Sequence, residues 1–290
     1  MIEKIVLGTV QLGLPYGINN QVGKPDKQQA LNILNRSFKE GITALDTANA
    51  YGNSREIIGE YHQQNKHTFE VISKCHWKGQ EIVQSVNEEL KVLNLSHFAS
   101  YLFHSFDDIY QLSTQNKEEF KTLVNNGIIK KIGVSVYGNE QFSQAIENDF
   151  ISVIQLPYNL LDNEFKKGEL LQLAKNKGKE IHLRSVFLQG LFYMNTSKLP
   201  EQLKPLEKYL LEIGKIALQN NISIGTLALG YALKNKNIDK VLIGVDSMEQ
   251  LLSNIESIKL IHSISDEMMK KISNLAVLET ELLNPVNWKK

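Results

Sequence analysis

The sequence contains a single cysteine, Cys75, so no disulfide can form within the chain, which fits the reducing cytoplasm. It also lacks net charge, because 32 Lys and Arg residues balance 32 Asp and Glu residues. The basic patch of a nucleic-acid-binding protein is therefore not expected. No apolar run approaches the ~18 residues of a transmembrane helix, and residues 1–8 are too few and too charged for a secretion signal. We expect a cytoplasmic protein, a monomer or small homo-oligomer, that acts on a small molecule without a membrane or nucleic-acid partner.

Short apolar runs alternate regularly with longer amphipathic runs along the chain. The apolar runs predict strands at residues 4–7, 43–46, 69–74, 101–104, 131–135, 151–155, 180–184 and 240–243. Helical spacing predicts helices at 26–40, 54–64, 81–93, 117–124, 140–147, 164–175, 201–219, 223–236 and 248–258. No linker rich in Pro, Gly or Ser divides this series, and the tail at 279–290 is expected to be irregular and to lie across one end. The pattern predicts an α/β fold, a single (β/α)8 TIM barrel with parallel strands that spans residues 1–290 as one domain.

Four polar side chains stand at the ends of consecutive predicted strands or in the loop that follows. Asp46, Lys74 and His104 each end an apolar run, and Tyr51 lies shortly after Asp46. In a barrel of parallel strands the C-terminal strand ends open onto one face, which carries the active site. A phenol, an ammonium, a carboxylate and an imidazole on that face suggest acid–base chemistry on a carbonyl or an alcohol.

Tyr51 is the expected general acid–base. A phenol has an ordinary pKa of about 10, which must be lowered for it to exchange its proton readily near neutral pH. A neighbouring ammonium stabilises the phenolate, so Lys74 is expected to lower the pKa of Tyr51 toward neutrality. Asp46 would keep Lys74 charged, and His104 would donate a hydrogen bond to a substrate oxygen. Each residue also has an ordinary structural explanation: the Asp can cap a helix, the Tyr can be half-buried packing, the Lys solvated and the His structural.

Motifs in order along nearly the whole chain resemble the aldo-keto reductase family. The fullest is Leu-Asp-Thr-Ala-Asn-Ala-Tyr-Gly-Asn-Ser at residues 45–54, and the others lie at 7–9, 72–74, 103–104, 132–135, 153–159 and 188–191. The resemblance implies a TIM barrel that binds a nicotinamide cofactor, NADPH or NADH, in an extended form, without a Rossmann fold and without a metal. It also implies a catalytic tetrad with Tyr51 as proton donor, Lys74 and Asp46 as the residues that tune it, and His104 as the group that orients the substrate.

The resemblance further implies a set of cofactor contacts spread over the mouth of the barrel. They are Gly8, Thr9, Asp46, Ser135, Gln155, Arg184, Ser185, Leu188, Gly190, Gly244, Asp246, Ser247, Gln250 and Asn254. Two positions depart from the family pattern, because Val136 stands in place of an Asn and Arg184 in place of a Tyr that stacks on the nicotinamide. A guanidinium plane can also stack on an aromatic ring, so Arg184 can replace the Tyr or reach the pyrophosphate. Ser247 is expected both to cap a helix and to line the cofactor site.

The segment at residues 244–254 has no Lys or Arg for the 2′-phosphate of NADP and has Asp246 and Glu249 instead. A carboxylate repels phosphate and can accept a hydrogen bond from a free 2′-hydroxyl. NADH is therefore more plausible than is usual for the family, although basic residues elsewhere could reach the site, and the choice stays open.

Three aromatic residues, Tyr16, Trp77 and Tyr158, are expected to lie near the mouth and to line the substrate pocket, although each can equally be packing. The loop at 11–17 and the segment at 184–190 resemble bacterial family members of sugar metabolism, which suggests an aldose, a keto-sugar or a nucleotide-linked sugar. Cys75 alternates to the other side of its strand and is given no catalytic role.

Two other functions remain open from the sequence. One is an aldolase-type barrel that forms a Schiff base through Lys74, which requires a lysine of lowered pKa. The other is a non-catalytic, reductase-like protein that senses a cofactor or binds a partner.

Overall fold

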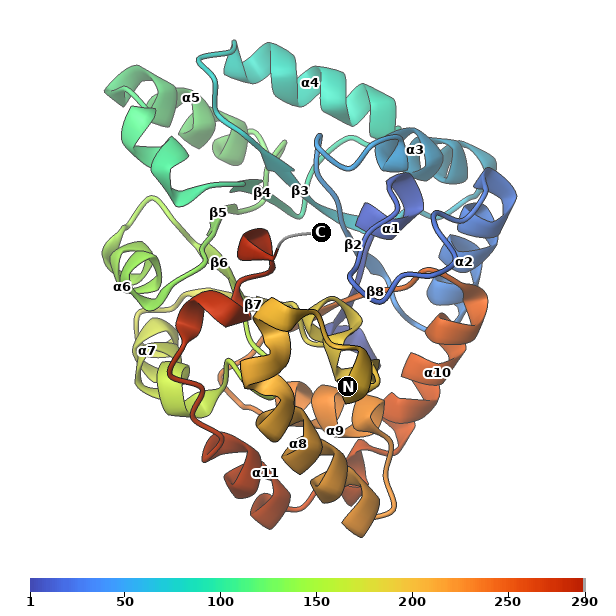
Figure 1. Cartoon of the computed structure of the whole chain (residues 1–290). Coiled ribbons are helices and arrows are strands. Elements are labelled where there is room, and N and C mark those ends of the chain that lie inside the picture. Colours follow the sequence, from blue (N-terminus) through green and yellow to red (C-terminus); the bar gives the residue numbers. More distant parts are fainter. Residues whose placement is uncertain (289–290) are drawn as a thin grey trace.

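The computed structural model describes residues 1–288; residues 289 and 290, the end of the predicted tail, lie outside the described part. Eight parallel strands pair in sequence order and close on each other, so the predicted (β/α)8 barrel is confirmed (Figure 1). The strands are β1 (Ile5–Gly8), β2 (Ala44–Asp46), β3 (Glu70–Cys75), β4 (Ser100–Phe103), β5 (Ile132–Ser135), β6 (Val153–Pro157), β7 (Glu180–Arg184) and β8 (Lys240–Gly244). Closure comes from β1 and β8, which pair from Ile5 opposite Val241 to Gly8 opposite Gly244.

The helices form a ring outside the barrel, with most of them where periodicity predicts them (Figure 1). They are α2 (Lys27–Lys39), α3 (Ser54–Gln64), α4 (Ile82–Leu93), α5 (Thr114–Asn125), α6 (Asn139–Glu147), α7 (Glu164–Asn176), α8 (Glu207–Gln219), α9 (Ile224–Leu233) and α10 (Met248–Lys259). Capping fixes several starts. Asp26 accepts a hydrogen bond from the backbone N–H of Gln29, whose side chain bonds back to Asp26, so α2 begins with a full capping box. No helix of the described residues is both long enough and apolar enough to span a membrane.

The structure differs from the expected elements in three places. The predicted helix at 201–219 is split, because Pro205 lies in a 3-10 turn, Glu201–Leu206, and α8 starts only at Glu207. Two short helices, α1 (Val10–Gly13) and α11 (Asp266–Ser273), were not predicted. The tail contains two 3-10 turns, Thr280–Leu283 and Pro285–Asn287, and the first of them packs against the 201–206 turn.

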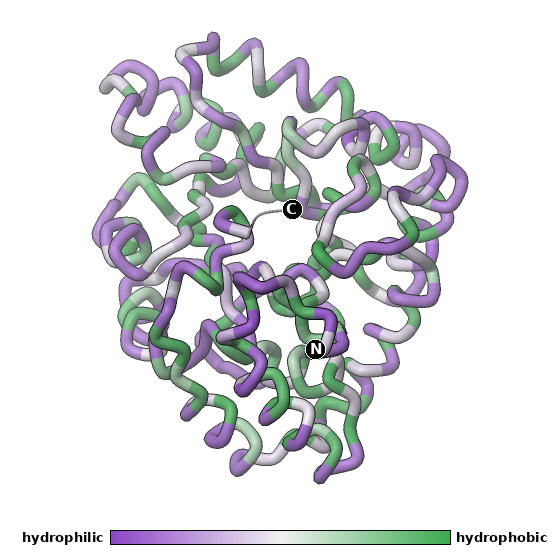
Figure 2. Tube along the Cα trace, viewed as in Figure 1, coloured by the Kyte–Doolittle hydropathy of each residue, from purple (hydrophilic) through white to green (hydrophobic). Residues whose placement is uncertain are grey.

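Two apolar layers hold the barrel together. The larger lies between the strands and the helices. Figure 2 shows hydrophobic and hydrophilic residues alternating along most of the outer helices, the pattern of helices with one apolar side toward the barrel. Helix α9 is almost wholly buried because α8 and α10 both pack against it. The smaller layer fills the barrel interior and consists of Val6, Ala44, Ile72, Leu102 and Leu242. This inner layer lies directly below the polar residues at the mouth of the barrel.

Candidate active site

The side chains at the mouth follow from the period of a strand. Successive side chains point to opposite faces, so a residue two positions beyond an inward-facing one also faces the barrel interior. The inner layer contains Ala44, Ile72 and Leu102. Two positions beyond them stand Asp46, Lys74 and His104, which therefore form the next layer toward the open end.

Asp46 and Lys74 form a buried ion pair at the bottom of the mouth, each about 2% exposed. Nζ of Lys74 also lies 3.3 Å from the carbonyl oxygen of Thr47. Burial works to lower the pKa of Lys74, but the charge of Asp46 and the contact with Tyr51 outweigh it, so the pKa is raised. Lys74 is therefore a fixed positive charge.

Tyr51 lies in the loop after β2, with Nζ of Lys74 5.1 Å from the centre of its ring. Its ring is nearly perpendicular to that of His104, with ring centres 6.1 Å apart and ring planes at 85°. Burial raises the pKa of Tyr51 above its ordinary value, and Lys74 offsets that effect only in part. The lowering expected from the sequence is therefore wrong for this structure, because desolvation of the phenol outweighs the ammonium. Tyr51 is a protonated phenol at neutral pH.

His104 directly follows β4 and is kept neutral. Burial, then the charges of Lys74, His76 and Arg184, lowers its pKa to about 3. Its Nδ1 atom is buried and has no hydrogen-bond partner among the described residues. A neutral imidazole still has one N–H to donate, so His104 can hold a substrate oxygen without carrying charge.

Gln155 on β6 joins this group in a way that the sequence did not reveal. Its Nε2 donates to Oδ2 of Asp46 at 2.8 Å, across the barrel. Its Oε1 is buried without a partner in the part of the chain that the structure describes. Buried amide oxygens normally accept a hydrogen bond, so this atom is free to receive an N–H donor from a ligand. Ser135 is buried at the end of β5, where it is paired in register with Gln155.

The loop after β7 has an unusual backbone. Ser185, Leu188, Gln189 and Gly190 all have positive φ, at 60°, 47°, 55° and 86°. Three of these are not glycine, so the conformation is strained, and such strain clusters at ligand-binding segments. Arg184, just before them, donates to the carbonyl oxygen of Val136 at 3.0 Å and lies 4.3 Å from the centre of the Tyr137 ring. Its guanidinium carbon thus lies over an aromatic ring of the protein itself.

At the other side of the mouth, β8 ends at Gly244 and α10 begins after Ser247. Ser247 caps α10, as predicted, by accepting from the backbone N–H of Gln250 at 3.3 Å. A side chain at Gly244 would collide with the amide of Gln11 from α1 unless that flexible side chain moved. Oε1 of Gln11 is buried and unpaired within residues 1–288, and nothing in the sequence pointed to it.

Asp246, between Gly244 and Ser247, is held from two directions. Its Oδ1 accepts from Nδ2 of Asn20 at 3.1 Å, and its backbone N–H donates to Oε1 of Gln250 at 2.9 Å. Burial raises the pKa of its carboxyl. Asn254 is buried on α10, one turn after Gln250.

The first strand contributes Gly8 and Thr9. Thr9 is buried, and its hydroxyl donates to the carbonyl oxygen of Asp46 at 3.0 Å, a hydrogen bond that joins the ends of β1 and β2.

The three aromatic residues expected to line the substrate pocket differ in exposure and in what they contact. Tyr16 is 41% exposed, and its hydroxyl accepts from Nε2 of Gln189, beside the strained loop. Trp77 is 7% exposed and belongs to the apolar core. Tyr158 is fully buried, stacks on Tyr231 of α9 with ring centres 5.5 Å apart, and donates to Glu164 at 3.0 Å. The prediction for Tyr158 is wrong, because residue 158 turns outward between strand and helix rather than into the mouth.

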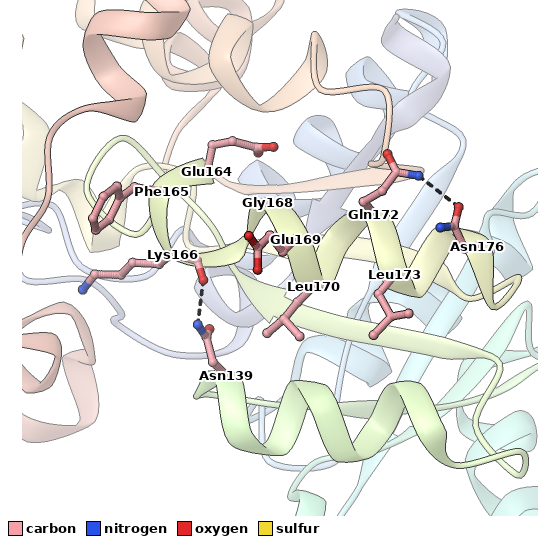
Figure 3. A pocket seen from close by; sticks show the side chains of 10 residues that line it. All are labelled: Asn139, Glu164, Phe165, Lys166, Gly168, Glu169, Leu170, Gln172, Leu173 and Asn176. Carbon is pink, nitrogen blue, oxygen red and sulfur yellow. Dashed lines mark hydrogen bonds between the residues drawn. The ribbon is translucent and has the colours of Figure 1, made fainter.

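An open groove of about 850 Å³ lies elsewhere, on the outer face between α6 and α7 (Figure 3). Phe165, Lys166 and Asn139 line it, and none of the mouth residues does. It is a shallow surface depression between two helices and has no cluster of catalytic groups. No group of three or more His, Cys, Asp or Glu residues among residues 1–288 is arranged to hold a metal ion.

Comparisons with known proteins agree with this architecture. The model of the aldo/keto reductase family matches residues 4–277. Among curated proteins, the chain is 29% identical over 190 residues to the aldo-keto reductase YhdN of Bacillus subtilis, covering 60% of this chain and 56% of that protein. It is 23% identical over 299 residues to L-galactose dehydrogenase of Arabidopsis thaliana, covering 96% of this chain and 91% of the relative. The holo form of the aldo-keto reductase AKR11C1 from Bacillus halodurans has the same fold, with a TM-score of 0.74 and 22% identity over 94% of this chain and 92% of that one.

The family match covers nearly the whole barrel, including every strand and the four polar residues at its mouth. The chain therefore belongs to the aldo/keto reductase family, whose members are NAD(P)(H)-dependent oxidoreductases.

Proposed function

We propose that this protein reduces the carbonyl group of an aldehyde or ketone, a sugar or sugar derivative, to an alcohol with NADPH or NADH, or runs the reverse reaction. The observation that carries the proposal is the Tyr51 phenol in contact with both a fixed ammonium, Lys74, and a neutral imidazole, His104, whose ring is nearly perpendicular to it. A carbonyl oxygen that gains negative charge needs a proton and hydrogen-bond donors, and this group offers both.

The residues have separate roles in this proposal. The nicotinamide supplies the hydride when bound. Tyr51 gives its phenolic proton to the substrate oxygen, and its raised pKa keeps that proton in place before reaction. Lys74, held by Asp46, stabilises the phenolate that remains. His104 donates a hydrogen bond to the same oxygen and fixes the orientation of the carbonyl.

The chain has matching groups for the cofactor. The unpaired Oε1 of Gln155 is an acceptor for the amide N–H of the nicotinamide carboxamide, and Ser135 beside it can add a hydroxyl. The strained loop of Ser185, Leu188 and Gly190 would cover the pyrophosphate. Gly8, Thr9, Gly244, Asp246, Ser247, Gln250 and Asn254 complete the set that we assign to the cofactor. Arg184 is assigned to the nicotinamide or the pyrophosphate.

The aldolase alternative is weakened by the charge of Lys74. A Schiff base forms on a neutral amine, and such lysines need a lowered pKa. Asp46 instead raises the pKa of Lys74 enough to outweigh its burial. A sugar-like substrate is supported by the polar mouth, by the partly exposed Tyr16 at its rim and by similarity to L-galactose dehydrogenase.

The test is oxidation of NADPH and NADH in the presence of a panel of aldehydes and ketones. Tyr51→Phe should reduce turnover by about 100-fold or more, the scale of a lost general acid, while fluorescence titration should show nearly unchanged cofactor binding. Tyr209→Phe, on the outer helix α8, is the matched control. Near-normal turnover in Tyr51→Phe would mean that the proton donor is a different group.

A further inference from the structure

A second histidine, His76, lies beside the proposed tetrad, and none of the roles assigned so far brings it into contact with the substrate. His76 follows β3, two positions beyond Lys74, so strand alternation directs it to the same side. Its ring stacks on that of His104, with centres 4.5 Å apart and planes at 14°. The side chain of His76 is 44% exposed, whereas Trp77 beside it is buried. His76 is thus a polar group that the mouth presents to a ligand.

A buried carboxylate holds His76 in this position. Nδ1 of His76 lies 3.5 Å from Oδ2 of Asp108, in the 3-10 turn Phe106–Gln111 that follows β4. The side chain of Asp108 is only 9% exposed, and Oδ2 makes no hydrogen bond with any of the described residues, so the contact that faces it is the 3.5 Å approach of His76. A buried carboxylate oxygen without a partner is costly, so His76 is the group that compensates it. Asp108 thereby sets both the orientation of the ring and the nitrogen that remains free, which is Nε2.

We propose that His76, oriented by Asp108, is a substrate-binding residue that recognises a hydroxyl group on the carbon next to the reacting carbonyl. The proposal rests on the proposed function, because it assumes that His104 holds the carbonyl oxygen. Two stacked imidazoles present two separate hydrogen-bonding edges side by side, as two oxygens on adjacent carbons require. The substrates favoured by this pair are α-hydroxy aldehydes and α-hydroxy ketones.

A hydroxyl suits Nε2 of His76 in either protonation state. When His76 is charged and paired with Asp108, Nε2–H donates to the hydroxyl oxygen. When His76 is neutral with its proton on Nδ1, facing Asp108, Nε2 accepts from the hydroxyl hydrogen. A substrate with a hydrogen atom in place of the hydroxyl leaves Nε2 without a hydrogen-bond partner in either state. Sites that leave a polar group unpaired in this way discriminate against substrates that lack the hydroxyl.

The experiment compares lactaldehyde with propanal, which differ only by the α-hydroxyl. The measured quantity is the ratio of kcat/KM for the two aldehydes, because the intrinsic reactivities cancel between wild type and variant. His76→Phe keeps a flat ring on His104 but removes both nitrogens, and it should lower the preference for lactaldehyde about 10-fold, the scale of one hydrogen bond. Asp108→Asn should lower it in the same direction by less. The control is His97→Phe. His97 lies before β4, at the N-terminal end of the strands and opposite the mouth, so this variant should leave the ratio unchanged.

A second measurement does not depend on turnover. Histidine-labelled protein is titrated with 1,2-propanediol and with 1-propanol, and the ring resonances of His76 are followed by NMR in the presence of cofactor. A shift with the diol and none with the monoalcohol supports the proposal, even where neither aldehyde is reduced and the proposed function fails. An unchanged aldehyde ratio in His76→Phe, or equal shifts with the two alcohols, would overturn it.

Discussion

Replacing Lys74 with Met should move alcohol oxidation to higher pH. Nζ of Lys74 lies 5.1 Å from the centre of the Tyr51 ring. Two unit charges at that separation interact by about 3 kcal/mol at an effective dielectric constant of ~20. One pKa unit is worth ~1.36 kcal/mol, so the loss of an interaction of this size should raise the pKa of Tyr51 measurably.

The direction follows from the charges that remain. Lys74 favours the phenolate, whereas Asp46 raises the pKa of Tyr51 and has no counter-charge once Lys74 is gone. Oxidation needs the phenolate to accept the alcohol proton, so its rate rises as pH passes through the pKa of Tyr51. The midpoint of that rise should therefore shift upward. Reduction at neutral pH starts from the phenol, which stays protonated in both proteins, so the starting state of Tyr51 does not change.

The assay is the pH profile of kcat/KM for alcohol oxidation, together with NMR titration of isotope-labelled tyrosine in which Tyr51→Phe identifies the signal. Adding Asp46→Asn to Lys74→Met removes the unpaired carboxylate and should bring the midpoint partly back. The double variant also controls for misfolding of Lys74→Met, because a buried charge left without its partner costs about 3–5 kcal/mol of stability and the double variant has no such charge. A Lys74→Met profile that coincides with that of the wild type would refute the coupling between Tyr51 and Lys74.

Two further results are expected at the mouth. Asp246→Arg should shift cofactor preference toward NADPH by about 1–3 kcal/mol, since Arg pairs with the 2′-phosphate and Asp repels it. Dissociation constants for both cofactors measure this, with Glu256→Arg, an exposed position further along α10, as a control for general charge. A wild type that already prefers NADPH by orders of magnitude would point to a basic residue elsewhere. The pKa of His104 is about 3, so at pH ~5 to ~8 it stays neutral and protonation of this ring should not slow reduction. An acid-side loss of rate in that range that vanishes in His104→Asn would contradict this assignment.

The sequence by itself determined the barrel and the polar layer at its mouth. Strand and helix periods differ, so alternating apolar runs were sufficient to place every strand within about two residues. Strand alternation then explains why Asp46, Lys74 and His104 follow the inward-facing Ala44, Ile72 and Leu102. These are local properties, since each depends on a few neighbouring residues, and for that reason they are readable from one chain.

Only the tertiary structure decided which of these groups meet and in what state. Gln155 reaches Asp46 from a position 109 residues away, and His76 stacks on His104 from a different strand. Such contacts depend on how the closed barrel aligns its strands, and no local pattern contains that register. The same holds for Tyr158, which packs outward, and for Tyr51, whose pKa is raised because burial outweighs Lys74. Desolvation depends on everything that surrounds a side chain, so the protonation state of the proposed acid is a property of the folded barrel and not of its motif.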